Sequence, residues 1–156
     1  GQASEDMTME DLPPPPDVAG LSLDGAETYT IEPEENARLC RSTGAEPASD
    51  GTAHPIYYYI ATQVGMGKTV AGLCAACDFD IDDGPMMVGS QAAFTHPLRI
   101  DTPYRVNGSI ISLTRKRSRK LGVMDLLEYR LVLVDANGEE ALACTNTWAL
   151  PRKELA

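Results

Sequence analysis

The sequence predicts an α+β domain in which one apolar helix packs against an antiparallel β-sheet. Three observations support this prediction. An apolar helix pattern follows His54, patterns typical of strands occupy most of the chain after it, and a tight-turn sequence joins the last two of those strands. One buried helix followed by an antiparallel meander has few packing solutions, and a sheet that wraps around the helix is the favoured one.

The helix pattern begins at Pro55 and ends at Gly65. Proline is tolerated in the first helical turn because its missing N–H would have no partner there, and glycine commonly ends a helix. The residues between them are apolar on nearly every side, which is typical of a buried helix rather than of a surface helix. We therefore expect a buried helix from Pro55 to about Met66.

Only strands are expected after this helix, in a sheet of five or more strands. Four segments are rich in β-branched and aromatic residues, which favour strands: Val88–Phe94, Tyr104–Leu113, Gly122–Val134 and Glu140–Trp148. Between the last two lies Asp135-Ala-Asn-Gly138. In this turn Asn137 and Gly138 are expected to supply the positive-φ positions of a hairpin.

The part of the chain before the helix is expected to contain a leader and one short helix. Residues Gly1 to Asp17 are acidic and polar, end in four prolines and lack the apolar residues for a core. We expect a disordered leader over 1–17, or alternatively a strip that docks a partner, and a single domain over 18–156. The short helix is predicted from Glu32 to Gly44, because Pro33 and acidic residues stand at its start.

Composition excludes several classes of protein. The chain has 156 residues, 43% of them hydrophobic, which suits one core. Its net charge of -10 argues against a general nucleic-acid binder, since such proteins concentrate positive charge. No apolar run approaches the ~20 residues that span a bilayer, and no signal peptide opens the chain. We expect a soluble, cytoplasmic protein without membrane contact.

The cysteines and histidines predict no metal site. Cys74-Ala-Ala-Cys77 has the spacing of half a zinc site or of a redox pair, but no second Cys-x-x-Cys follows. Only two histidines occur, and neither has acidic residues at ligand spacing. We expect the four cysteines to be reduced and mostly buried.

Several segments together resemble the MaoC-like dehydratases, the family of fatty-acid-synthase-type (R)-specific enoyl-CoA hydratases. The resemblance covers about Leu21 to Arg152. Its segments are Thr52-Ala-His-Pro-Ile56, Gln91 to Ile100, the basic stretch Arg117 to Gly122 and the Asp-x-x-Gly turn at Asp135. It implies a hot-dog fold, in which a long central helix is wrapped by an antiparallel sheet. Family members pair two such units into a double hot dog, which covers the exposed sheet edge.

The same resemblance implies the addition of water across the double bond of an enoyl thioester, or its reverse. Catalytically competent relatives carry an Asp and a His, five positions apart, in a Gly-Asp-x-Asn-Pro-x-His segment, and such a pair can act as acid and base. Here the matching segment is Gly44-Ala-Glu-Pro47. Ala45 stands at the Asp position, and no His follows at the family spacing.

Three interpretations of this segment remain open. In the first, the chain is the half of a hydratase or dehydratase that lacks the Asp/His pair, binds acyl-CoA and works with a catalytic hot-dog partner. In the second, Glu46 or Asp50 works with His54 in a rearranged pair. In the third, the chain is a non-enzymatic homodimer that binds acyl thioesters or serves as a scaffold.

Two groups of substrate-binding residues are expected, with a coenzyme A or carrier-protein thioester as substrate and no separate cofactor. Backbone N–H groups of Ile56 and Tyr57, at the positive end of the helix dipole, could hold the thioester oxygen. The basic run Arg115, Lys116, Arg117, Arg119 and Lys120 is either a solvated loop or a contact for coenzyme A phosphates or an acidic carrier protein. Arg99 and Arg105 could add to that contact.

Overall fold

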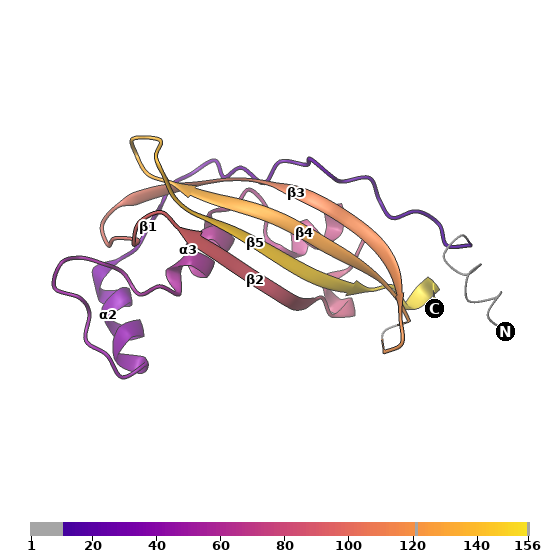
Figure 1. The fold of residues 1–156 in the computed structure, drawn as a ribbon, viewed down its shortest axis with the longest axis horizontal. Helices are drawn as coiled ribbons and strands as arrows, with labels where there is room; N and C mark the ends of the chain where they lie inside the picture. The colour runs from indigo at the N-terminus through magenta and orange to yellow at the C-terminus, as the bar shows by residue number, and fades with distance from the viewer. Residues whose placement is uncertain (1–10, 121, 156) are drawn as a thin grey trace.

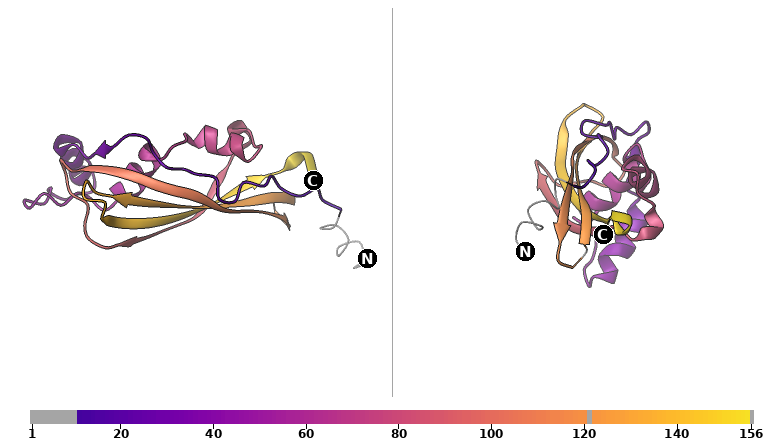
Figure 2. Two further views of the ribbon diagram at one scale, coloured as in Figure 1. Left: turned by 90° about the horizontal axis from the view of Figure 1, so that it is seen from above. Right: turned by 90° about the vertical axis from the view of Figure 1, so that its right-hand side faces the viewer.

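The computed structural model describes residues 11–120 and 122–155, which form a curled antiparallel sheet with helices along it (Figure 1). The sheet has five strands in the order β1-β3-β4-β5-β2. The strands are β1 (Tyr29–Thr30), β2 (Met86–Phe94), β3 (Pro103–Ser118), β4 (Gly122–Val134) and β5 (Glu140–Pro151). The helices α2, α3 and α4 all lie on one side of the sheet, as Figure 2 shows in two views. This hot-dog-like arrangement agrees with the fold class that the sequence predicts.

The strand predictions are confirmed in position, and β4 agrees with its prediction at both ends. Along β4 every second side chain is buried from Val123 to Leu133, because successive side chains of a strand point to opposite faces and one face meets the helices. The prediction was wrong for the length of β3, which continues through Arg115 to Ser118. Most of the basic run is therefore part of a strand and only its last two residues lie in the turn.

The β4–β5 hairpin forms where it was predicted, but different groups form its turn. Gly138 has φ +80°, whereas Asn137 is not among the residues with positive φ. Instead, the side chain of Asp135 builds the turn: its Oδ1 accepts hydrogen bonds from the backbone N–H groups of Asn137 (2.9 Å) and Glu139 (3.0 Å). A turn with one left-handed glycine and a register shift next to it is a common longer hairpin.

The central helix α3 (Tyr57–Gly65) packs on the sheet with one face only. Tyr57, Ala61 and Thr62 are buried, but Val64 is 65% exposed. The expectation of burial on all sides was wrong, because the sheet covers a single side of a helix. The expectation that only strands follow was also wrong: α4 (Val70–Ala76) and the 3-10 turn η1 (Ile81–Asp83) come before β2.

The two edges of the sheet differ. Residues 20–25 and β1 cover the outer edge of β3, with hydrogen bonds from the backbone N–H groups of Gly20, Leu23 and Gly25 to carbonyl oxygens of β3, each at 2.8 Å. Strand β2, in contrast, pairs with β5 on one side, and the described ranges contain no strand on its other side. The free edge of the sheet is therefore β2.

The short helix predicted before α3 is present in the structure. Helix α2 (Pro33–Ser42) ends just before Gly44, whose φ is +85°. Residues 1–10 of the expected leader lie outside the described residues. Within the described part, the carbonyl oxygens of Pro13 and Pro14 accept hydrogen bonds from Arg115 Nη1 at 2.7 and 3.2 Å. No helix within the described ranges is long and apolar enough to cross a membrane.

A buried ion network joins the far end of the sheet to α4. Asp125, fully buried on β4, accepts hydrogen bonds from Arg115 (Nε to Oδ1 2.8 Å, Nη2 to Oδ2 2.9 Å) and from Arg152 (Nε to Oδ2 2.8 Å). Arg152 also donates to the carbonyl oxygens of Cys77 and Asp78, at the end of α4. The carboxylate thus has two buried cationic partners, and these fix the chain after β5 against α4.

Candidate functional site

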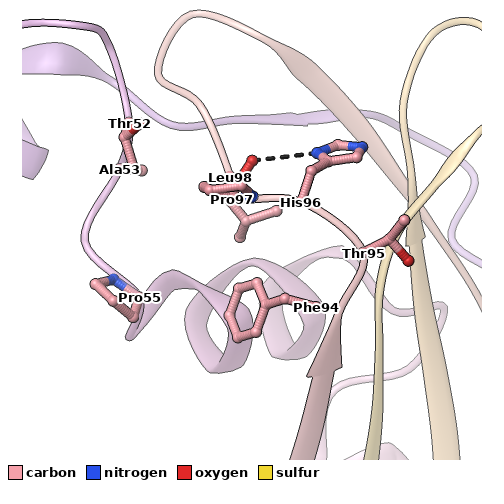
Figure 3. Close-up of a pocket in the computed structure, with 8 residues that line it drawn as sticks. All are labelled: Thr52, Ala53, Pro55, Phe94, Thr95, His96, Pro97 and Leu98. Atoms are coloured by element: carbon pink, nitrogen blue, oxygen red, sulfur yellow. Dashed lines mark hydrogen bonds between the residues drawn. The ribbon is translucent and has the colours of Figure 1, made fainter.

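A pocket of about 470 Å³ lies where α3 begins (Figure 3). Two segments form it, one just before α3 and one that starts at the end of β2. They are held together by a hydrogen bond from Ala53 N to Leu98 O (2.7 Å) and by a bridge between Thr52 and Arg99. The lining residues are Thr52, Ala53, Pro55, Phe94, Thr95, His96, Pro97 and Leu98.

The pocket is suited to an apolar group with a polar end. Pro55 and Phe94 lie on opposite sides of it in Figure 3, and Leu98 lies above them on the loop that follows β2. Phe94 is 43% exposed, which leaves an aromatic surface open to a ligand. The polar lining groups are two threonines and His96.

The two histidines hold their protons on different nitrogens when neutral. His96 Nδ1 lies 3.2 Å from Pro97 O, and a carbonyl oxygen can only accept, so Nδ1 carries the proton and Nε2 is an acceptor. His54 Nδ1 accepts from the backbone N–H of Ile56 at 3.0 Å, so its proton is on Nε2. His96, which lines the pocket, can therefore act as a hydrogen-bond acceptor through Nε2.

The backbone N–H groups predicted to hold a thioester oxygen already donate hydrogen bonds within the protein. Ile56 N donates to the His54 ring, and Tyr57 N donates to His54 O at 3.1 Å. His54 N in turn donates to Asn36 Oδ1 on α2, at 2.8 Å. A ligand oxygen would therefore compete with His54 for these N–H groups.

The candidate acid–base residues stand outside the pocket. Glu46 forms an ion pair with Arg41 at 3.4 Å, and both side chains are exposed. Asp50 Oδ1 accepts from Thr52 N at 2.9 Å, and this bond lowers the pKa of the Asp50 carboxyl. Ala45 follows α2, and its N–H donates to Cys40 O at 3.0 Å. The structure does not bring Glu46 or Asp50 together with His54 in the pocket lining.

The contact by which α2 positions the start of α3 was not predicted. The buried Tyr57 donates from its hydroxyl to Glu35 Oε1 at 2.7 Å. Burial, followed by the contact with Glu35, raises the pKa of Tyr57 well above its usual range. Together with the bond between Asn36 and His54, this contact fixes the segment that lines the pocket. In the sequence, Glu35 and Asn36 have the pattern of polar residues on a surface helix. Composition alone does not distinguish them from the other polar residues of α2.

The basic run has one buried side chain and four exposed residues in the structure. The Arg115 side chain is only 7% exposed and is bound to Asp125, whereas Lys116, Arg117, Arg119 and Lys120 are exposed. Arg115 therefore belongs to the buried ion network, and the expectation that it lies in a solvated loop was wrong. The exposed part forms the β3–β4 hairpin, named here the basic hairpin. It stands at the opposite end of β3 from the pocket, roughly 50 Å away along a strand of 16 residues (Figure 1).

Arg99 and Arg105 do not lie in the basic hairpin. The Arg99 side chain donates to the carbonyl oxygen of Asp50, beside the pocket. Arg105 donates to the carbonyl oxygen of Ala26 at the covered edge of β3. Both guanidinium groups thus hold loops in place.

All four cysteines are free and buried, as predicted. Burial raises the pKa of Cys77 to about 11 and also raises the pKa of Cys74. Because the thiolate is the reactive form, this pair is poorly suited to redox chemistry at neutral pH.

Comparison with known proteins identifies the fold. No family model and no curated protein matches the sequence. Among solved structures, the chain is similar to the HadBC (3R-hydroxyacyl-ACP dehydratase) complex from Mycobacterium tuberculosis, with 14% identity and a TM-score of 0.60 over 85% of this chain and 97% of that one. It is also similar to the MaoC-like dehydratase from Rhodospirillum rubrum, with 13% identity and a TM-score of 0.58 over 93% of this chain and 97% of that one.

A thioesterase from Thermus thermophilus, complexed with coenzyme A and Zn, shares the fold at 9% identity and a TM-score of 0.53, over 81% of this chain and 78% of that one. The chain thus has a hot-dog-like fold whose structural neighbours include MaoC-like dehydratases and thioesterases. This agrees with the resemblance found in the sequence. At such low identity the similarity shows the fold alone.

Proposed function

We propose that this chain is the acyl-thioester-binding subunit of an (R)-specific enoyl-CoA hydratase or 3-hydroxyacyl-thioester dehydratase, and that a hot-dog partner supplies the Asp/His pair. The observation that carries the proposal is the pocket at the start of α3, which is apolar and open but has neither Glu46 nor Asp50 in its lining. The dehydratase neighbours support the choice of reaction. Ala45, at the Asp position of the family segment, supports the need for a partner.

The free edge of β2 is the proposed seam with that partner. Its nine residues, Met86 to Phe94, carry no charged side chain, although the chain has a net charge of -10. Exposed edge strands are usually protected by charges, proline or a covering segment, and here such protection is found at the β3 edge instead. Pairing through β2 would continue the sheet into a second hot dog. Because Phe94 ends β2, the pocket would then open at the seam.

This pairing also gives the basic hairpin a role. The hairpin is too far from the pocket of its own subunit to share one ligand with it. In an antiparallel pairing across β2 with a partner of the same fold, the partner is reversed end to end. The basic hairpin of this chain then lies toward the end of the partner that corresponds to the pocket end of this chain. We propose that Lys116, Arg117, Arg119 and Lys120 contact coenzyme A phosphates in this way.

Binding of butyryl-CoA tests the pocket. Replacing Phe94 with Glu places a carboxylate in the apolar wall, where it would be desolvated by the ligand, and we expect the dissociation constant to rise by about tenfold or more. Isothermal titration calorimetry of wild-type and variant proteins measures the change.

Ile111→Glu is the matched control for this test. Ile111 lies on β3, away from both the pocket and β2, and is 43% exposed, as is Phe94. Its substitution adds the same charge to the sheet without touching the pocket or the proposed seam, so the affinity should stay near that of the wild type. Equal loss in both variants, or no loss in Phe94→Glu, would show that the pocket does not hold the thioester.

A further inference from the structure

A chain of hydrogen-bonding side chains leads away from the pocket beneath α3. It begins at Tyr58, whose ring packs edge-on against Phe94 in the pocket wall, with ring centres 6.4 Å apart. The Tyr58 hydroxyl lies 3.1 Å from Ser90 Oγ, and Ser90 Oγ lies 2.6 Å from Asn146 Oδ1. We name these three residues the polar relay.

The direction of the polar relay follows from the chemistry of its last member. An amide oxygen can only accept, so the Ser90 hydroxyl donates its hydrogen bond to Asn146 Oδ1. Tyr58 must therefore be the donor in the hydrogen bond between Tyr58 and Ser90. The Tyr58 oxygen is left with its lone pairs, which can accept a hydrogen bond from another group.

The sheet surface between the pocket and the polar relay is partly exposed. Phe94, Ala92 and Ser90 share one face of β2 because side chains alternate along a strand. Their partners on β5 are Leu142, Cys144 and Asn146, all of which are buried on the inner face of the sheet. Ala92 and Phe94 are nevertheless exposed. The strip is therefore only partly covered: Ala92 is exposed, and Tyr58 of α3 reaches from Phe94 to Ser90.

Asn146 forms the inner end of the polar relay. The residue is fully buried, and its Nδ2 is the one buried side-chain nitrogen or oxygen without a hydrogen-bond partner in the described part of the chain. Because this nitrogen is buried, the group of the polar relay that faces a ligand beside Phe94 is the Tyr58 oxygen. The strip thus ends in a hydrogen-bond acceptor, Tyr58.

We propose that the pocket and this strip take an acyl group that carries a hydroxyl substituent toward its distal end, rather than a plain alkyl chain. A hydroxyl can donate to the Tyr58 oxygen, whereas an alkyl chain cannot and leaves that oxygen desolvated. The inference rests on the proposed binding of acyl thioesters and adds the chemical class of the acyl group.

Two matched pairs of ligands test this preference: butyryl-CoA with 4-hydroxybutyryl-CoA, and hexanoyl-CoA with 6-hydroxyhexanoyl-CoA. Titration of the wild-type protein should show that the hydroxylated member of at least one pair binds about tenfold more tightly, as one well-placed hydrogen bond allows. Tyr58→Phe should abolish the preference by weakening the hydroxylated ligand alone. Tyr59→Phe removes the hydroxyl of the neighbouring residue, which lies outside the polar relay, and should keep the preference.

The outcomes separate this inference from the function on which it rests. Equal or tighter binding of the alkyl members, or a preference that survives in Tyr58→Phe, would overturn the polar relay as the determinant while acyl-thioester binding stands. Failure of all four ligands to bind would overturn acyl-thioester binding itself, and with it this inference.

Discussion

Replacing Asp125 with Ala is expected to lower the free energy of unfolding by about 3–5 kcal/mol, the usual cost of removing one partner from a buried ion pair. The carboxylate is fully buried and accepts from both Arg115 and Arg152, whose side chains are 7% and 4% exposed. Without it, two guanidinium groups remain in the interior with no anion between them. Urea denaturation of the two proteins gives the difference.

Glu139→Ala serves as the control for this measurement. It removes an exposed carboxylate from the β4–β5 turn, and such surface changes usually stay within about 0.5 kcal/mol. A loss of under about 1 kcal/mol for Asp125→Ala would show that the ion network contributes little to folding.

Replacing Gly25 with Ala should have the second largest effect. A Cβ atom at this position would stand 1.9 Å from the backbone oxygen of Gly65, at the end of α3. Since neither backbone can yield without moving α3 or breaking the bond from Gly25 N to Val106 O, we expect a loss of about 3 kcal/mol, the upper end of the usual overpacking penalty.

Gly89→Ala is the matched substitution, because a Cβ atom at Gly89 meets nothing within 4 Å. Thermal unfolding of both variants should separate them clearly. If Gly25→Ala unfolds at the temperature of the wild type, the close contact between residues 23–25 and the end of α3 does not constrain the fold.

The features that the sequence predicted correctly are those with local causes. The strands were found because β-branched and aromatic residues and a two-residue period act within each segment, and α2 because its proline, acids and glycine stand at its ends. The extension of β3 was missed because Arg and Lys suggested a solvated loop. Arg115 lies in a strand because its partner Asp125 comes from the neighbouring strand, and that is a tertiary contact which composition does not reveal.

The pocket could be predicted only in part. Both segments that form it, Thr52 to Ile56 and Gln91 to Ile100, were singled out by resemblance to a family, but nothing in either segment shows that they touch. Their contact through Ala53 and Leu98 depends on how the sheet curls under α3. The same holds for the polar relay, whose members Tyr58, Ser90 and Asn146 come from a helix and two strands. The partial exposure of α3 also had no local signal.

Hydration of crotonyl-CoA is the measurement that tests the central claim most directly, with the loss of the enoyl thioester followed over time. The purified chain alone should show little or no turnover, and activity should appear when a MaoC-like partner carrying the Gly-Asp-x-Asn-Pro-x-His segment is added. Binding without turnover in both cases would favour the non-enzymatic homodimer. Brisk hydration by the chain alone, abolished by His54→Ala, would contradict the account and establish a rearranged pair of His54 with Glu46 or Asp50.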